Sequence, residues 1–201
     1  MIIYMMRHGE TDWNVQHLFQ GRTDIPLNEN GRKVAEWTRD GLKDVHFDVA
    51  FCSPLCRAKE TAQIILEGRD IELIEDERII EMGFGEYEAT MMHQSNESMK
   101  LFFQHPEQYH EDKGVETFEA VLERANDFLN DLMSNPKYQD STILVATHGA
   151  MIRGLMCAFK ENPIKDFWEG GVHKNCGMTI VEVQGKEKKI LQEAIVLYKE
   201  K

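Results

Sequence analysis

Two apolar stretches that each end on a histidine and a glycine constrain this sequence more than any other feature. The first, from Ile2 to Met6, runs directly into Arg7, His8 and Gly9. Such a short run of apolar residues is typical of a strand covered on both faces, and strands of this kind belong mostly to α/β sheets. In open α/β sheets the ligand crevice lies beyond the carboxyl ends of the strands. Arg7 and His8 therefore stand where a binding site is expected, although a solvated Arg-His pair fits this stretch alone equally well.

The second stretch repeats the pattern of the first. From Ser141 the chain reads Ser-Thr-Ile-Leu-Val-Ala-Thr and then reaches His148 and Gly149, after which a helical pattern begins. If both strands lie in one sheet, both imidazoles are predicted at the same edge.

Two further charged residues are candidates for the same edge. Ser53 and Pro54 predict a helix start, with serine as the cap and proline at the first position, where its missing N–H is not needed. Arg57 follows one turn into that helix, and Glu81 follows a short apolar pair. Considered alone, Arg57 is an ordinary solvated arginine and Glu81 is one acid among many. Together, two histidines, two arginines and one carboxylate suit phosphoryl transfer without a metal.

The composition limits the class of protein. At 201 residues, with 42% hydrophobic and 29% charged residues, the chain fits one globular domain over residues 1–201. Its formal net charge of −12 argues against a nucleic-acid partner, because nucleic-acid phosphates require a basic surface. Arg7, Arg57 and a third candidate, Arg22, would have to form a positive pocket within this negative field.

The sequence carries no signal for a membrane or for disulfides. No apolar stretch reaches the roughly 18 residues of a membrane helix, and the first residues lack a signal-peptide pattern, so we expect a cytoplasmic protein without a membrane partner. Cys52 and Cys56 are weak metal or redox candidates, but buried reduced thiols are the better interpretation of all four cysteines.

The motifs, taken together, identify a resemblance. They are Arg7-His8-Gly9-Glu10-Thr11, Asn14, Gln20-Gly21, Leu27-Asn28-Glu29-Asn30-Gly31, Ser53-Pro54-Leu55-Cys56-Arg57-Ala58, Glu81 and Thr147-His148-Gly149. In this order and spacing they resemble the histidine phosphatase superfamily, the phosphoglycerate mutase-like group, over most of the chain. The resemblance implies a three-layer α/β/α sandwich whose central sheet is mostly parallel with an antiparallel edge, and an enzyme without a cofactor.

The resemblance also implies roles for the site residues. His8 would attack phosphorus and form a phosphohistidine, and Glu81 would protonate the leaving group. Arg7, Arg57 and His148 would hold the phosphoryl oxygens, and the remaining substrate-binding residues would be Asn14, Gln20, Gly21 and Gly149. A zinc site on the two histidines is the metal alternative, but the neighbouring arginines would repel a divalent cation, so we expect no metal.

The periodicity of the remaining chain predicts further elements. Helices are expected over 28–42, 53–66, 96–104, 117–133 and from 149 to near 162, and strands over 47–52, 71–74, 178–183 and 190–197, with a loop over 76–88. We expect residues 91–115 to form a lid-like insertion beside the site.

The expected reaction is metal-independent hydrolysis of a small phosphorylated metabolite by a histidine-type acid phosphatase. A cofactor-dependent phosphoglycerate mutase is the alternative, but between Glu81 and Arg124 the only strong bases are Lys100 and Lys113. In addition, Phe84 stands where the mutases of this family have a tyrosine.

A non-catalytic phosphate-binding module is a further alternative. Such a module would be expected to lack His8 or Glu81, and the chain has both.

The aromatic and methionine residues of 91–115 suggest either room for an apolar leaving group or simple packing; they are Met91, Met92, Phe102, Phe103 and Tyr109. A broad-specificity phosphomonoesterase, a sugar-phosphate phosphatase and an α-ribazole-phosphate phosphatase all fit this sequence. Nothing in it indicates the oligomeric state.

Overall fold

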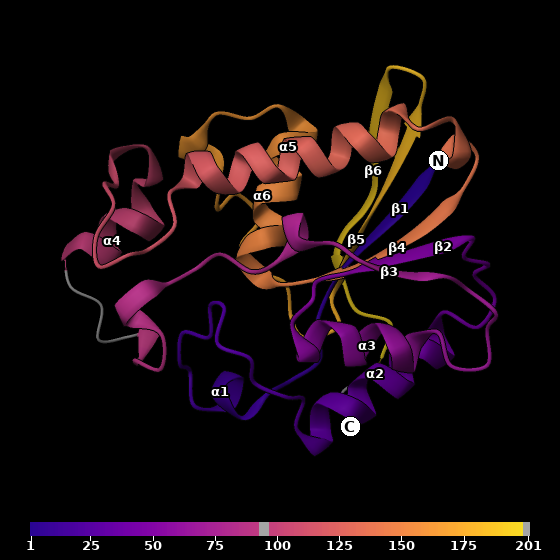
Figure 1. The fold of residues 1–201 in the computed structure, drawn as a ribbon, viewed down its shortest axis with the longest axis horizontal. Helices are drawn as coiled ribbons and strands as arrows, with labels where there is room; N and C mark the ends of the chain where they lie inside the picture. Colours follow the sequence, from indigo (N-terminus) through magenta and orange to yellow (C-terminus); the bar gives the residue numbers. More distant parts are fainter. Residues whose placement is uncertain (93–96, 199–201) are drawn as a thin grey trace.

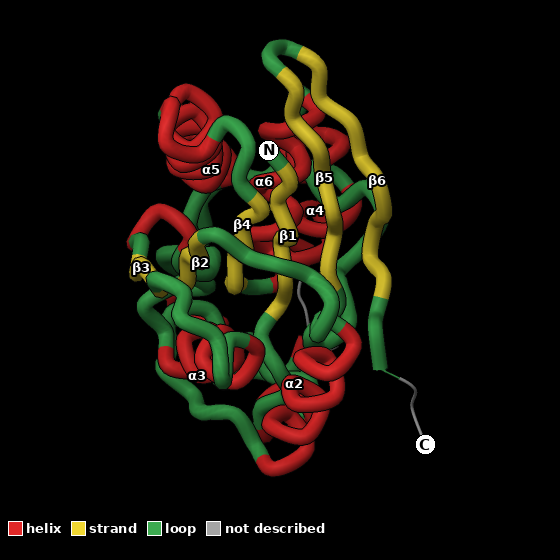
Figure 2. Tube along the Cα trace, turned by 90° about the vertical axis from the view of Figure 1, so that its right-hand side faces the viewer, coloured by secondary structure: helices red, strands yellow, loops and turns green. Residues whose placement is uncertain are grey.

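A six-stranded sheet forms the centre of the computed structural model, which describes residues 1–92 and 97–198. The strands are β1 (Ile2–Arg7), β2 (Val49–Cys52), β3 (Leu73–Glu75), β4 (Thr142–Thr147), β5 (Met178–Gln184) and β6 (Glu187–Ile195), in the order β3-β2-β4-β1-β5-β6 (Figure 2). The first four strands in this order are parallel, whereas β5 is antiparallel to β1 and β6 is antiparallel to β5. The predicted mixed sheet with an antiparallel edge is confirmed.

Helices cover both faces of the sheet (Figure 1). The α-helices are α1 (Asp12–Val15), α2 (Glu29–Gly41), α3 (Cys56–Ile65), α4 (Glu97–Gln104), α5 (Phe118–Ser134) and α6 (Gly149–Lys160). Helices α2 and α3 lie on one face, and α5 and α6 lie on the other. The larger apolar core lies between the sheet and α5 and α6, and a smaller core, which includes Leu42, Phe47 and Ile65, lies on the opposite face.

The register of the two central strands places the two histidines. In the parallel β1–β4 pair, Arg7 lies opposite Thr147, so the next residue of each strand is a histidine. The backbone N–H of His8 donates to the carbonyl of Thr147 at 2.9 Å, which extends the pairing by one residue. His8 and His148 therefore leave the sheet side by side at its carboxyl edge.

The helix start predicted at Ser53 and Pro54 is wrong. Helix α3 begins at Cys56, and the side chain of its N-cap residue, Leu55, makes no capping hydrogen bond. The Asp24 carboxylate accepts the N–H of Cys56 at 2.8 Å instead. Ser53 Oγ lies 2.7 Å from a ring nitrogen of His148, so this serine belongs to the site rather than to a helix cap.

Other predicted boundaries agree more closely with the structure. Asn28 caps α2 and Thr117 caps α5, each by accepting a backbone N–H on its side chain. The 76–88 segment contains two short 3₁₀ turns, Glu77–Ile79 and Gly85–Tyr87. The predicted helix over 96–104 corresponds to α4. The first residue of the prediction, Asn96, lies outside the described residues, and so do positions 93–95 of the predicted lid. None of the helices in the described part of the chain has the length and apolarity needed to cross a membrane.

Candidate active site

The hydrogen bond of His8 fixes which of its ring nitrogens carries the proton. Nδ1 lies 2.6 Å from the carbonyl oxygen of Gly9. A carbonyl can only accept, so Nδ1 donates, and the neutral ring keeps an unprotonated Nε2. Burial and the positive charges of Arg57 and Arg7 hold the pKa of His8 well below its usual range, which keeps the ring neutral. His8 thus offers a lone pair at Nε2.

His148 lies next to His8 and is fully buried. The centroids of the two rings are 5.2 Å apart, with the ring planes tilted by 59°. Nε2 of His148 meets Ser53 Oγ at 2.7 Å, whereas its Nδ1 is buried without a protein partner in the described part of the chain. Burial, followed by the charge of Arg57, also holds the pKa of His148 well below its usual range. The expected convergence of the two imidazoles is present.

The guanidinium groups of Arg7 and Arg57 are anchored by backbone carbonyls. Arg7 Nη1 donates to the carbonyl of His173 at 2.5 Å. Arg57 is completely buried, and its Nη1 and Nη2 donate to the carbonyls of Thr23 and Gly21 at 2.9 and 2.7 Å. Neither guanidinium pairs with a carboxylate in the described structure, and each keeps a buried Nε without a partner there. Both cations are therefore held in place without being neutralised, as an anion site requires.

Glu81 holds its carboxylate at the amino-terminal end of α6. Oε1 accepts the backbone N–H groups of Met82 and Met151 at 2.9 Å each, and Oε2 accepts that of Ala150 at 3.3 Å. The Thr147 hydroxyl donates to the carbonyl of Ile79 at 2.6 Å and so ties this segment to the end of β4. Only 7% of Glu81 is exposed, and it lines the same pocket as His8.

Two asparagines connect the loop after β1 to the loop before β5. Asn14 Oδ1 accepts hydrogen bonds from the backbone and hydroxyl of Thr11 and from Asn175 Nδ2, so its own Nδ2 lies on the opposite side of the amide. Asn175 Nδ2 also lies 3.1 Å from the carbonyls of His8 and Gly9. Asn14 was predicted from the sequence, but Asn175 was missed. Its segment has no apolar periodicity, and only the β1–β5 pairing brings it to the site.

The remaining predicted residues have different surroundings. Gln20 and Gly149 line the pocket, and the Oε1 atom of Gln20 is buried without a partner in the described structure. Gly21 also lines it, with a φ of +53°, and an added Cβ would lie 1.9 Å from Glu88 Oε1, so a larger residue there would displace the Glu88 carboxylate. Arg22 does not line the pocket: its guanidinium lies 3.1 Å from a Glu116 oxygen. The expectation that Arg22 adds to the positive pocket is wrong.

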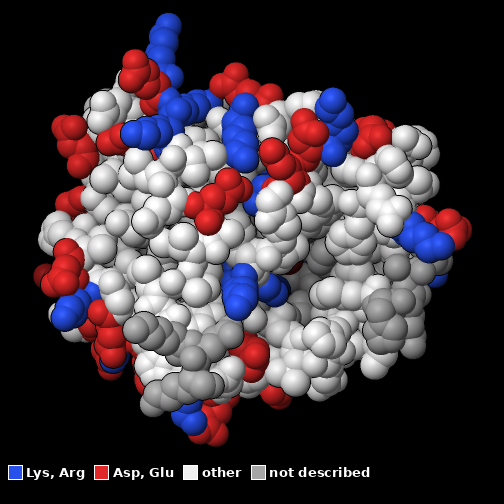
Figure 3. All heavy atoms as spheres, turned by 180° about the vertical axis from the view of Figure 1, so that it is seen from behind, with Lys and Arg blue, Asp and Glu red and all other residues white. Residues whose placement is uncertain are grey.

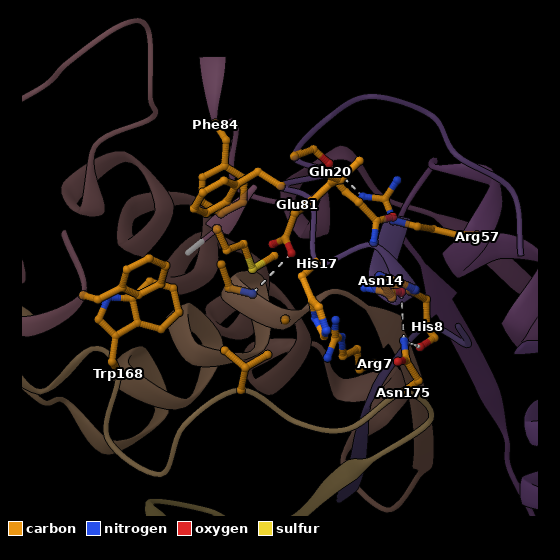
Figure 4. Close-up of a pocket in the computed structure, with 18 residues that line it drawn as sticks. Arg7, His8, Asn14, His17, Gln20, Arg57, Glu81, Phe84, Trp168 and Asn175 are labelled. Carbon is orange, nitrogen blue, oxygen red and sulfur yellow. Dashed lines mark hydrogen bonds between the residues drawn. The ribbon is translucent and has the colours of Figure 1, made fainter. Parts of the chain in front are cut away.

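The pocket has a volume of about 320 Å³ and two chemically different sides. Figure 4 shows Arg7, His8, Asn14 and Arg57 on one side and Phe84 and Trp168 on the other, with Glu81 between them. The apolar residues that line the pocket are Leu18, Phe19, Phe84, Met92, Phe103, Trp168 and Val172.

The aromatic and methionine residues predicted near the site divide into those that line the pocket and those that do not. Phe103 and Met92 line the pocket, whereas Phe102 is completely buried in the core and Tyr109 packs against that core. For the latter two, the packing interpretation holds. Trp168, which comes from the segment after α6, was not predicted, because nothing in the sequence links it to the 91–115 region.

Residues 1–92 and 97–198 form neither a metal-binding cluster nor a disulfide. On the face seen in Figure 3, acidic and basic side chains are interspersed rather than separated. Within the described ranges, no three His, Cys, Asp or Glu side chains are grouped as a metal ion would need. All four cysteines lie in these ranges and are free thiols.

Comparisons with known proteins agree with this geometry. The chain is 34% identical over 154 residues to an uncharacterized phosphatase, PhoE, of Bacillus subtilis, covering 77% of this chain and 75% of PhoE. It is 28% identical to phosphoserine phosphatase 1 of Hydrogenobacter thermophilus, covering 94% and 90% of the two chains. The solved structure of Bacillus stearothermophilus YhfR superposes with a TM-score of 0.88 at 32% identity over 97% of both chains. These relatives support the predicted class, a hydrolytic phosphatase. Residues 3–195 match the model of the histidine phosphatase superfamily, branch 1, and the chain therefore belongs to that family.

Proposed function

We propose that this protein is a phosphomonoesterase that hydrolyses a small phosphorylated metabolite through a phosphohistidine at His8. One observation carries the proposal: a neutral imidazole, locked by Gly9 so that Nε2 is unprotonated, lines one pocket with two guanidinium groups that form no ion pair with a carboxylate of the described residues. A nucleophile beside two cations is suited to a phosphate dianion, because planar guanidinium groups match the charge on its oxygens.

In the first step, the Nε2 lone pair of His8 forms a bond to phosphorus while the bond from phosphorus to the ester oxygen breaks. Arg7 and Arg57 hold the non-bridging oxygens, and the buried Nδ1 of His148 donates to one of them when it carries the proton. Preorganised donors of this kind are often the largest catalytic contribution, with one donor worth roughly 3 kcal/mol.

Glu81 carries the proton in both steps. Its carboxyl group gives a proton to the leaving alkoxide and, as a carboxylate, then takes one from the water that attacks the phosphohistidine. The bond from phosphorus to His8 breaks, inorganic phosphate leaves, and the enzyme returns to its starting state. Three backbone N–H groups hold this carboxylate at the pocket, which supports its position there and its role as the base of the second step.

Hydrolysis is favoured over mutase chemistry by the composition of the pocket. A mutase must hold a second anionic group while its bisphosphorylated intermediate reorients. Among the described residues that line the pocket, the only lysines or arginines are Arg7 and Arg57, and the transferred phosphoryl group occupies both.

The proposed function also bears on the domain organisation and the location of the protein. We propose that residues 1–201 form one domain, with 91–115 as an insertion beside the pocket that sets substrate choice. Met92 and Phe103 line the pocket and support this view. We propose a cytoplasmic location as well, where phosphorylated metabolites are found.

The test is hydrolysis of p-nitrophenyl phosphate in the presence of EDTA, together with trapping of a phosphoenzyme by acid-free quenching. We expect activity to persist in EDTA. His8→Ala should form no phosphoenzyme, and its rate should fall on the order of a thousandfold or more. His110→Ala, which replaces an exposed histidine, is the matched control and should behave as wild type.

Three outcomes would contradict the proposal. Activity that disappears with EDTA would indicate a metal site, and no activity on any phosphomonoester would indicate a binding module. Transfer of phosphate to 3-phosphoglycerate in the presence of its 2,3-bisphosphate, at a rate above that of hydrolysis, would indicate a mutase.

A further inference from the structure

We propose that the alcohol part of the substrate is an uncharged apolar or aromatic group that binds between Phe84, Phe103 and Trp168. This inference rests on the proposed phosphatase function and specifies its substrate class. With the phosphate held by the arginines, the opposite side of the pocket is the surface left for the leaving group, and Figure 4 shows Phe84 and Trp168 there.

The first argument is the charge of the lining. Apart from Arg7, Arg57 and Glu81, the described lining residues carry no Lys, Arg, Asp or Glu. A carboxylate on the leaving group would lie near Glu81. It would find no lysine or arginine other than Arg7 and Arg57 among the described lining residues, where the remaining basic side chains are the imidazoles of His8 and His17. Burying an unpaired charge is strongly unfavourable, so the pocket disfavours acids such as phosphoserine and phosphoglycerate.

The second argument is the packing of the aromatic side. The ring centroids of Phe103 and Trp168 are 5.3 Å apart, those of Phe19 and Phe84 4.9 Å, and those of Phe19 and Phe103 6.3 Å with nearly parallel planes. The Trp168 indole N–H donates to the carbonyl of Phe102 at 2.8 Å, which fixes the orientation of the indole. The wall is thus formed before any ligand arrives, which reduces the entropy cost of binding.

The third argument is exposure. Three side chains at the pocket, Met92, Phe103 and Val172, are 39%, 38% and 49% exposed. They form an apolar rim on a protein whose net charge is −12. Exposed apolar surface that is continuous with a pocket is typical of a ligand-binding groove. An apolar leaving group would cover this rim, whereas a small polar one would leave it in water.

The experiment compares phosphate esters of similar alcohols, so that the ability of the oxygen to leave is nearly the same. We expect kcat/KM for 2-phenylethyl phosphate to exceed that for ethyl phosphate about tenfold or more, and 3-phosphoglycerate to be hydrolysed more slowly than either. Phe103→Ala should reduce the ratio of kcat/KM for 2-phenylethyl phosphate to kcat/KM for ethyl phosphate about fivefold. Phe103→Arg should raise kcat/KM for 3-phosphoglycerate relative to ethyl phosphate.

Leu101→Ala is the matched control, because Leu101 lies on the same helix with 37% exposure but does not line the pocket. It should leave every ratio as in wild type. Equal kcat/KM for the three esters, or a ratio that Phe103→Ala does not change, would overturn the inference while leaving the phosphatase intact. No hydrolysis of any ester would instead overturn the proposed function.

Discussion

Single hydrogen bonds at the two histidines determine what each ring can do. Gly9 accepts from Nδ1 of His8 and so leaves Nε2, the proposed nucleophile, unprotonated. For His148 the partner is the hydroxyl of Ser53, which accepts the N–H of Leu55 at 3.3 Å. The serine hydroxyl can therefore donate its own hydrogen to Nε2 of His148. In that arrangement Nδ1 carries the proton, as its proposed role as a donor to the phosphoryl oxygens requires.

Ser53→Ala tests this arrangement. Without the hydroxyl, Nε2 of His148 loses its partner and the proton can move to it, so Nδ1 stops donating. We expect kcat/KM to fall about tenfold, equivalent to roughly 1.4 kcal/mol, with the larger part of the change in kcat. Steady-state kinetics on one substrate provide the measurement.

The control removes the same kind of bond elsewhere. His173 Nε2 lies 2.7 Å from the Thr179 hydroxyl, and neither residue lines the pocket. Thr179→Val should change the free energy of unfolding. Because it leaves the His173 carbonyl that anchors Arg7 in place, it should change the rate much less than Ser53→Ala does. Equal kinetic effects from Ser53→Ala and Thr179→Val would indicate that Ser53 acts only through stability.

Asn175 gives a second prediction at this scale. Its Nδ2 lies within 3.2 Å of three oxygens, on His8, Gly9 and Asn14. Asn175→Asp would turn a donor into a carboxylate oxygen that faces acceptors, so we expect a larger loss of kcat/KM than for Asn175→Ala. Steady-state kinetics of the two variants measure this difference, and a kcat/KM of Asn175→Asp equal to that of Asn175→Ala would refute the prediction.

Among the strands and helices, the sequence predicts an element correctly where that element has its own local signal. The apolar runs before His8 and His148 predicted both strands, and their shared register then placed the rings together. Ser53 shows the limit: Ser-Pro fits a helix cap locally, but the serine contacts His148, 95 positions away in the sequence. Asn175 and Trp168 were missed for the same reason. They lie in irregular segments whose positions depend on long-range packing, which no local pattern encodes.

Close contact between the β1 loop and α2 supports the position of His8. Gly31, near the start of α2, approaches Glu10 so closely that an added Cβ would lie 2.1 Å from its carbonyl oxygen. An added Cβ at Gly9 would lie 2.7 Å from the carbonyl of Gly31. In both cases the nearest atom belongs to the backbone, which cannot move away as the end of a side chain could.

Gly31→Ala should therefore destabilise the protein although alanine favours helices. We expect a loss of roughly 2 kcal/mol in the free energy of unfolding, measured by urea titration. Gly154→Ala in α6 is the comparison, because its Cβ would lie 2.7 Å from a Val121 methyl group, which can shift. Since an alanine gains about 1 kcal/mol in helix propensity, the second variant should lose clearly less. A larger loss at Gly154 would contradict this account.

On the scale of the whole molecule, buried neutral histidines couple stability to pH. His8, His148 and His173 are each at most 3% exposed, and the pKa of each lies below its usual value. For His173, burial, followed by the charge of Arg153, lowers the pKa to about 4. In the unfolded chain a histidine titrates near 6.5. The unfolded state therefore binds more protons between these values, and stability falls as the pH decreases.

For His173 alone, the loss begins below pH 6.5 and ends near pH 4. Between pH 7 and pH 5 it amounts to roughly 2 kcal/mol. His173→Gln keeps an amide that can donate to Thr179 but cannot titrate, so we expect its free energy of unfolding to fall less than that of wild type over this interval. Urea titrations at the two pH values measure the difference.

His110→Gln, at an exposed position, should retain the wild-type dependence of the free energy of unfolding on pH. An identical decrease in wild type and His173→Gln would mean that His173 gains no proton on unfolding, and the acid sensitivity would then have to come from other groups, such as His8 and His148.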